Sequence, residues 1–176
     1  YVFEDGVLGG TGSIAGSVDN YGTIEPGDST TGTLTLKNFA TAKTTHLFVR
    51  PASVLRFKIA SASEHDQLNV NGSVKYFDMT QDFSISEEMP RIQIVIEKDA
   101  SIKVGDEFQL LTAKSKTSQV DNWNFELIQP ERYTWEIEEQ ETDGEFSIVA
   151  RLISFNDPEN LEDEGEQEDP DEGEKM

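Results

Sequence analysis

The sequence predicts an all-β protein, and three observations support that prediction. Glycine recurs through the first 36 residues, where each glycine inside a helix would cost about 1 kcal/mol relative to alanine. Between these glycines, short apolar groups stand beside Thr and Val, which favour extended backbone. Further along, apolar and polar residues alternate with the period of two that is typical of half-buried strands.

The first glycine-rich stretch repeats a triplet of glycine, small hydroxyl and aliphatic residue. Its copies are Gly12-Ser13-Ile14, Gly22-Thr23-Ile24 and Gly32-Thr33-Leu34, spaced by ten residues. In a β-solenoid, such a repeat places the glycine at a corner and the aliphatic side chain in a narrow internal stack. The triplets therefore predict a short β-solenoid-like N-terminal part.

Alternating residues predict further strands in the middle of the chain. In the clearest amphipathic example, Leu55, Phe57 and Ile59 share one face, whereas Arg56 and Lys58 lie on the other. The dipeptide Asn71-Gly72 predicts a tight hairpin or a solenoid corner. The strands expected in this region are 47–49, 54–59, 68–74, 92–96 and 108–111.

The last three apolar segments, 123–127, 133–137 and 146–152, are longer and alternate more regularly than the opening ones. They predict an antiparallel sheet or sandwich, with Asp143-Gly144 as the turn before the final strand. Such a sheet would cap the open end of the solenoid-like part and protect its edge. We therefore expect residues 1–155 to form a single all-β module.

Residues 156–176 are expected to be a disordered acidic linker or tail. From Asp157 to Met176 there are eleven acidic residues and one lysine. A segment with dense like charge and almost no apolar content cannot offset its chain entropy by burial. We expect this linker to join the module to a neighbouring domain of the same polypeptide.

Charge and composition exclude several classes of function. The formal net charge is −21, from 35 acidic and 14 basic residues, which argues against nucleic acid and anionic membranes as partners. No apolar run is long enough to span a bilayer, so no membrane insertion is expected. Cysteine is absent, which excludes disulfides, thiol nucleophiles and thiolate zinc sites. The chain begins in mid-pattern, and we expect any export signal to have been lost upstream.

Three short motifs have a structural interpretation that outweighs the chemical one. Residues 10–15 match a dinucleotide-binding pattern, but the residues that follow do not favour the required helix. Glu64-His65-Asp66 offers metal donors, yet adjacent strand residues point to opposite faces and cannot converge easily. The tail segment 169–173 lacks the spacing of a calcium loop. We therefore assign no catalytic residue, no metal and no cofactor, and expect the module not to be an enzyme.

Aromatic residues near the end of the module suggest a glycan-binding platform. Sugar rings stack on aromatic planes through their C–H faces, and polar neighbours can bond their hydroxyl groups. The alternative is core packing, which is favoured because these aromatic residues share their faces with Leu and Ile. The candidate platform residues are Trp123, Phe125, Tyr133, Trp135, Asn124 and Arg132.

Three blocks of the chain resemble the autotransporter-associated β-strand repeat region. The first is DGVLGGTGSIAGSVDNYGTIEPGDSTTGTLTL, which begins at Asp5. The second is HDQLNVNG, which begins at His65, and the third is GDEFQLLTA, which begins at Gly105. The order and spacing of the three blocks agree with the family's pattern, and the resemblance spans residues 5–155.

The resemblance implies a function that the residues alone do not. Such regions occur as non-catalytic modules of secreted enzymes that degrade plant polysaccharides, including xylanases of Bacteroidetes, and in the passengers of bacterial autotransporters. We therefore expect an accessory module, a spacer or carbohydrate-binding module, of a secreted or cell-surface enzyme, with xylan or glucan as the possible polysaccharide partner. The alternative is a stem fragment of an autotransporter or adhesin passenger.

Overall fold

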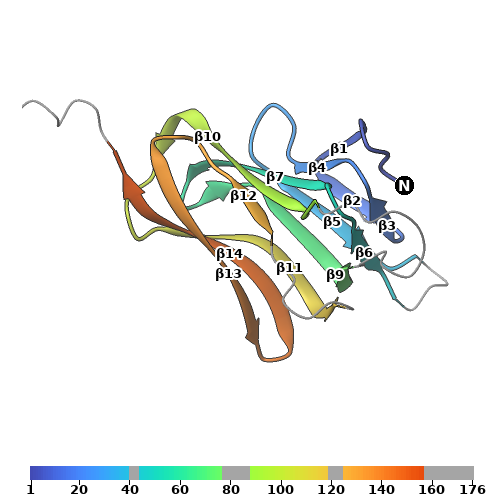
Figure 1. The fold of residues 1–176 in the computed structure, drawn as a ribbon. Helices are drawn as coiled ribbons and strands as arrows, with labels where there is room; N and C mark the ends of the chain where they lie inside the picture. The colour runs from blue at the N-terminus through green and yellow to red at the C-terminus, as the bar shows by residue number, and fades with distance from the viewer. Residues whose placement is uncertain (40–43, 77–87, 119–124, 157–176) are drawn as a thin grey trace, which may run out of the picture.

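A computed structural model describes residues 1–39, 44–76, 88–118 and 125–156. These residues contain strands and no helix, which confirms the all-β prediction for the described part of the chain (Figure 1). The strands are β1 (Val7–Gly10), β2 (Gly12–Ala15), β3 (Val18–Asn20), β4 (Thr23–Pro26), β5 (Thr33–Lys37), β6 (His46–Val49), β7 (Val54–Ser61), β8 (Glu64–His65), β9 (Gln67–Tyr76), β10 (Arg91–Ser101), β11 (Glu107–Ser118), β12 (Glu126–Ile128), β13 (Tyr133–Thr142) and β14 (Glu145–Phe155).

The strands form two mixed sheets, and the chain passes repeatedly from one sheet to the other. The six-stranded sheet has the order β1-β4-β7-β10-β12, with β8 paired to β7. The eight-stranded sheet has the order β13-β14-β11-β9-β5-β2, and β6 pairs with both β3 and β9. Every pairing among β1–β7 and β9–β12 is parallel, and we call these strands the parallel stack. The colours in Figure 1 accordingly run from blue to orange across the sheets.

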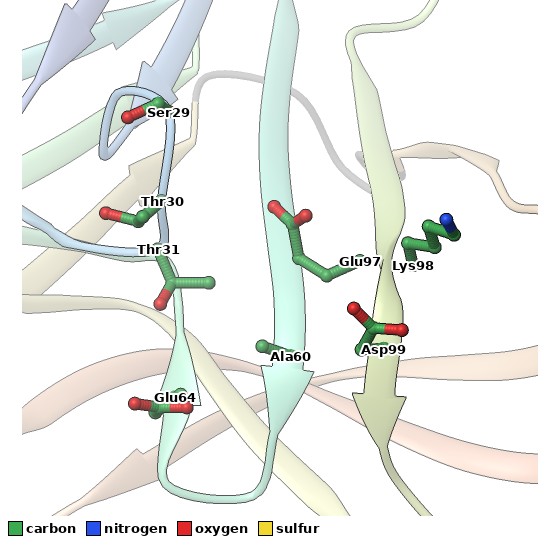
Figure 2. Close-up of a pocket in the computed structure, with 8 residues that line it drawn as sticks. All are labelled: Ser29, Thr30, Thr31, Ala60, Glu64, Glu97, Lys98 and Asp99. Carbon is green, nitrogen blue, oxygen red and sulfur yellow. The ribbon is translucent and has the colours of Figure 1, made fainter.

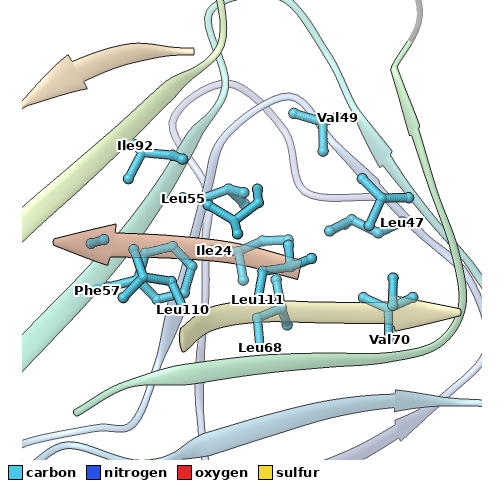
Figure 3. Packing of buried hydrophobic residues seen from close by; sticks show 14 of the residues in the cluster. Ile24, Leu47, Val49, Leu55, Phe57, Leu68, Val70, Ile92, Leu110 and Leu111 are labelled. Carbon is cyan, nitrogen blue, oxygen red and sulfur yellow. The ribbon is translucent and has the colours of Figure 1, made fainter. Parts of the chain in front are cut away.

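The register of the parallel stack places aliphatic residues opposite one another on successive strands. In the six-stranded sheet this ladder comprises Leu8, Ile24, Leu55, Ile92 and Leu127. In the eight-stranded sheet a second ladder comprises Ile14, Leu36, Val70 and Ala113. Members of both ladders belong to one buried cluster, and Figure 3 shows side chains from both sheets filling that cluster. Burial of these ladders stabilises the fold through the hydrophobic effect.

The ten-residue spacing of the opening triplets is not the period of the stack. The triplets at Gly12 and Gly32 lead into β2 and β5 of the eight-stranded sheet, whereas the triplet at Gly22 leads into β4 of the other sheet. The residues that pair are further apart, since Val7 lies opposite Thr23 and Gly12 lies opposite Leu34. The triplets mark where strands begin, as expected, but neighbouring copies do not stack on each other.

The prediction of a hairpin or corner at Asn71-Gly72 is wrong. Strand β9 continues through these residues from Gln67 to Tyr76. The backbone of Thr45 crosses close to Gly72, so a methyl group there would collide with the Thr45 carbonyl oxygen. Ser73 donates its backbone N–H to the same oxygen at 3.0 Å. Glycine is needed here for a close approach of two chain segments, and not for a turn.

The expectation of an antiparallel end is correct for two of the three final segments. Strands β13 and β14 form an antiparallel hairpin, in which Thr142 lies opposite Glu145. The turn between them is Asp143-Gly144, with φ values of 53° and 81° that suit a two-residue hairpin loop. Strand β12, however, pairs in parallel with β10 and belongs to the stack. Side-chain alternation reports which face is buried and does not report strand direction, so it could not separate these cases.

Candidate functional site

The described members of the predicted aromatic platform do not form an exposed plane. Trp135 is 5% exposed and belongs to the hydrophobic core. Its ring meets Phe108 edge-on, with the centroids 5.5 Å apart. The alternation that suggested a platform therefore places Trp135 in the core, as the alternative interpretation expected.

The remaining platform residues lie in different surroundings. Phe125 is half-buried and meets Tyr76 edge-on at 5.7 Å between centroids. Tyr133 is half-buried and stacks on Phe155, with centroids 4.9 Å apart. Arg132 is exposed in the turn before β13. Trp123 and Asn124 lie outside the described residues, so glycan binding at these positions stays a prediction.

Four charged side chains lie close together: Glu25 on β4, Arg56 and Lys58 on β7, and Asp66 in the segment after β8. Glu25 accepts hydrogen bonds from Arg56 at 2.9 Å and from Lys58 at 3.3 Å. The ammonium group of Lys58 also lies 3.3 Å from a carboxylate oxygen of Asp66 and donates to the carbonyl of Pro26 at 3.2 Å. Each acid in this group therefore has a basic partner.

Asp66 is fully buried, and its carboxylate holds backbone together. One oxygen accepts the N–H of Gly32 at 2.8 Å and the other accepts the N–H of Lys58 at 2.8 Å. Burial raises the pKa of Asp66, although these two backbone donors and Lys58 act in the opposite direction. The residue joins the segment before β5 to β7.

Glu25 differs from Asp66 in the direction of its pKa. Burial alone would raise the pKa of Glu25, but the hydrogen bonds from Arg56 and Lys58 outweigh it and leave the pKa lowered. A carboxylate held in its ionised form by two cations is a poor general acid or base near neutral pH. Glu25 is therefore not poised for proton transfer.

The sequence did not reveal the burial of Lys58. Its position opposite the apolar face of β7 predicted a solvent-exposed side chain, yet the residue is 7% exposed. The chain folds back through β8, which pairs antiparallel with β7, and so brings Asp66 against Lys58. The only sequence signal for this burial is that Asp66 follows Lys58 by eight residues. That spacing becomes informative only once the antiparallel pairing of β8 with β7 is known.

A polar hollow of about 370 Å³ is formed by residues of β7, β8, β10 and the loop before β5. Its lining includes Thr30 and Thr31 before β5, Glu64 of β8, and Glu97 and Asp99 of β10. Figure 2 shows Glu97 pointing across β7 toward the loop with the two threonines, whereas Lys98 points to the other side of β10. Hydroxyl and carboxylate groups of this kind can bond a ligand rich in hydroxyl groups.

The described residues contain no group of three or more His, Asp or Glu side chains arranged to hold a metal ion. Glu64, His65 and Asp66 diverge as expected: Glu64 is exposed, His65 meets Phe108 edge-on at 5.5 Å, and Asp66 is buried beside Lys58. After residues 10–15 the chain continues as strands, so the dinucleotide pattern lacks its helix. The segment 169–173 lies outside the described residues.

The fold is an all-β module of two sheets. Most of its strands stack in parallel, and the antiparallel β13–β14 hairpin forms one end of the eight-stranded sheet. No family model matches the chain, and no curated protein matches it either. Among the described residues, no helix is long and apolar enough to cross a membrane.

Proposed function

We propose that this chain is a non-catalytic accessory module of a secreted or cell-surface enzyme that degrades plant polysaccharide, such as a xylanase. In this proposal, residues 1–155 form a short β-solenoid-like stack that continues into an antiparallel sheet, and the acidic residues 156–176 link it to a neighbouring domain. The module acts as a spacer, as a carbohydrate-binding module, or as both. The sequence resemblance to the autotransporter-associated β-strand repeat region supports the proposal.

The observation that carries this proposal is the use of charged residues in the parallel stack. Asp66 accepts two backbone N–H groups, and Glu25 is paired with Arg56 and Lys58. These side chains join strands that are distant in sequence, and so they contribute to architecture. A stack built from parallel strands with aliphatic ladders can carry a neighbour at a fixed distance, which is the property that a spacer requires.

The same stacking supports a second candidate, the stem of an autotransporter or adhesin passenger. A stem also needs successive strands that repeat along one direction, as β1, β4, β7, β10 and β12 do in the six-stranded sheet. The full-length coding sequence discriminates between the two. A glycoside hydrolase domain joined through residues 156–176 is expected for the accessory module, and a translocation domain in its place would favour the passenger.

The proposal is tested with two assays on the purified chain. Incubation with soluble xylan and β-glucan should release no reducing ends, because no acid and base pair is assigned. Native electrophoresis through gels that contain the same polysaccharides then measures retardation, which distinguishes a binding module from a pure spacer. Polysaccharide turnover by the isolated chain would overturn the proposal.

A further inference from the structure

The first three residues form a short extended segment with two aromatic side chains facing solvent. Val2 is 7% exposed and anchors the segment in the core. Its N–H donates to the carbonyl of Asp19 at 2.9 Å, and its own carbonyl accepts from Tyr21 at 2.8 Å. Because side chains alternate along extended backbone, Tyr1 and Phe3 point outward, with 85% and 74% of their surfaces exposed.

The two exposed rings are nearly parallel. Their centroids are 6.5 Å apart, and their planes differ by 19°. Large aromatic side chains are usually at least partly buried in proteins. Two neighbouring aromatic planes that both face water therefore call for a functional explanation.

The backbone under these rings is fixed by close packing. Residues 3–6 form a turn, in which the N–H of Gly6 donates to the carbonyl of Phe3 at 2.8 Å. This turn lies directly on Gly22, where a side chain would collide with the carbonyl oxygens of Phe3 and Gly6. Thr23 donates its N–H to the Gly6 carbonyl at 2.9 Å. The backbone that carries Phe3 is thus held in place before any ligand arrives, which lowers the entropic cost of binding.

Tyr21 lies close to this segment, and an ion pair supports it. The guanidinium carbon of Arg50 lies 5.2 Å from the centre of the Tyr21 ring. Arg50 in turn donates two hydrogen bonds to Asp19, at 2.6 and 2.7 Å. Tyr21 and the exposed pair line a hollow of about 510 Å³, and we call it the N-terminal hollow. It is lined by Tyr1, Phe3, Glu4, Asp5, Gly6 and Tyr21.

We propose that the N-terminal hollow binds a neutral oligosaccharide chain, with sugar rings lying on Tyr1 and Phe3 and sugar hydroxyls donating to Glu4 and Asp5. The proposal rests on the proposed accessory function and names its contact site. Aromatic planes suit the C–H faces of sugar rings, and exposed carboxylates accept hydrogen bonds from hydroxyl groups. The volume of the hollow lies within the range of small-molecule sites.

Charge favours a neutral ligand over an anionic one. Glu4 and Asp5 repel anions, as does the formal net charge of −21. A cationic peptide is the competing ligand that these two acids allow, and tetralysine tests it below. A neutral, hydroxyl-rich chain meets no charge repulsion and can use both the aromatic planes and the carboxylates.

Isothermal titration of the chain with xylohexaose and with cellohexaose tests the proposal. We expect at least one of these oligosaccharides to bind, and Phe3→Ala and Tyr1→Ala each to weaken that binding by about tenfold or more. Both side chains are exposed, so the variants should keep the circular dichroism spectrum of the parent. Phe39→Ala is the matched control, because Phe39 is 55% exposed and lies outside the hollow. It should change the affinity by less than about twofold.

Each of the other outcomes overturns the proposal in a distinguishable way. If a hexasaccharide binds equally well to Phe3→Ala and Phe39→Ala, the hollow is not the site, although the accessory function stands. If tetralysine binds in place of either sugar and Phe3→Ala abolishes that binding, the hollow is a cation site. If neither sugar nor tetralysine binds, the hollow has no such role and the module is a spacer. Turnover of xylan, in contrast, contradicts the accessory function itself.

Discussion

The parallel stack and the β13–β14 hairpin differ in how their strands find their neighbours. In the hairpin, a two-residue turn joins the strands and sets the register, with Thr142 opposite Glu145. In the stack, paired residues are far apart in sequence, since Ile24 pairs with Leu55 and Leu55 pairs with Ile92. The hairpin register is therefore local information, whereas the stack depends on contacts between distant segments.

The two regions also use charged residues differently. In the stack, Lys58 and Asp66 are buried and bridge segments before and after β7. In the hairpin, Glu136, Glu139 and Glu141 of β13 are exposed at the edge of the eight-stranded sheet. Exposed charge on an edge strand discourages pairing with another chain. Buried charge therefore joins the segments of the stack, and exposed charge protects the edge of the hairpin.

The largest expected effect is the loss of the buried ammonium group. Lys58→Met should lower the free energy of unfolding by about 4 kcal/mol, because it leaves Asp66 buried without its basic partner. Urea denaturation measures the change, and the exposed Lys98→Met is the matched control. Adding Asp66→Asn to Lys58→Met should recover part of the loss. If Lys58→Met behaves like its control, the ion pair does not hold the stack together.

Trp135→Ala should have the next largest effect, a loss of about 3 kcal/mol, because it removes a buried ring from the core beneath the hairpin. Thr134→Ala, at the neighbouring exposed position on β13, is the control. Urea denaturation followed by near-ultraviolet circular dichroism measures both variants. Unchanged stability in Trp135→Ala would mean that the ring is exposed in solution and available to a ligand.

Gly72→Ala should destabilise the chain by about 2 kcal/mol, because its methyl group would push against the backbone of Thr45. The matched hairpin variant is Gly144→Ala, where the open site offers no collision but φ is 81°. Gly144→Ala should lower the free energy of unfolding by about 1 kcal/mol, because of backbone strain alone. Thermal unfolding ranks the two variants. The reverse order would show that the backbone of Thr45 does not press on Gly72.

The pH dependence of stability should be a smaller effect, centred on β6 and β8, which carry the histidines. Burial lowers the pKa of His46 and of His65 below the ordinary value of 6.5, and Lys75 adds to the effect at His46. As the pH falls through 6.5, the unfolded chain binds protons before the folded chain does, so stability declines. Asp66 acts in the opposite direction, since its raised pKa lets the folded state take up a proton first.

Amide hydrogen exchange at pH 7.5 and pH 5.5, corrected for intrinsic rates, measures this dependence. Protection of β6 and β9, which pair with each other, should fall more than that of β13 and β14, because the two histidines of the chain lie on β6 and β8. The variant His46→Gln/His65→Gln should remove the difference. An equal loss of protection in the hairpin would assign the effect to other groups.

The comparison explains which features could be predicted from the sequence. The strands around Phe57, Ile94 and Ile148 were predicted because alternation is a local pattern. The Asp143-Gly144 turn was predicted because its residues favour the required backbone conformation. The parallel partner of each strand could not be predicted, because the spacing between paired residues changes along the chain, as Val7 with Thr23 and Val54 with Arg91 show.

The candidate sites likewise divide into features that a local sequence pattern predicts and features that depend on contacts between distant segments. Core packing of Trp135 was the favoured alternative because Tyr133 and Ile137 share its face. The hollow near Tyr1 was missed, because Tyr21, which lines it, follows β3, whereas Arg50, which contacts Tyr21, follows β6. The Lys58 and Asp66 pair was missed because it depends on the return of the chain through β8. Each of these two features can be recognised only once the tertiary fold is known.

Methyl NOE spectroscopy on protein labelled at Ile and Leu tests the parallel stack most directly. The register predicts cross-peaks between Ile24 and Leu55 and between Leu55 and Ile92, which join three strands of the six-stranded sheet. Assignments are confirmed with Ile24→Val and Ile92→Val, which remove one set of peaks each. Absence of both cross-peaks, with contacts instead between β4 and β5 across the ten-residue spacing of the triplets, would contradict the stack.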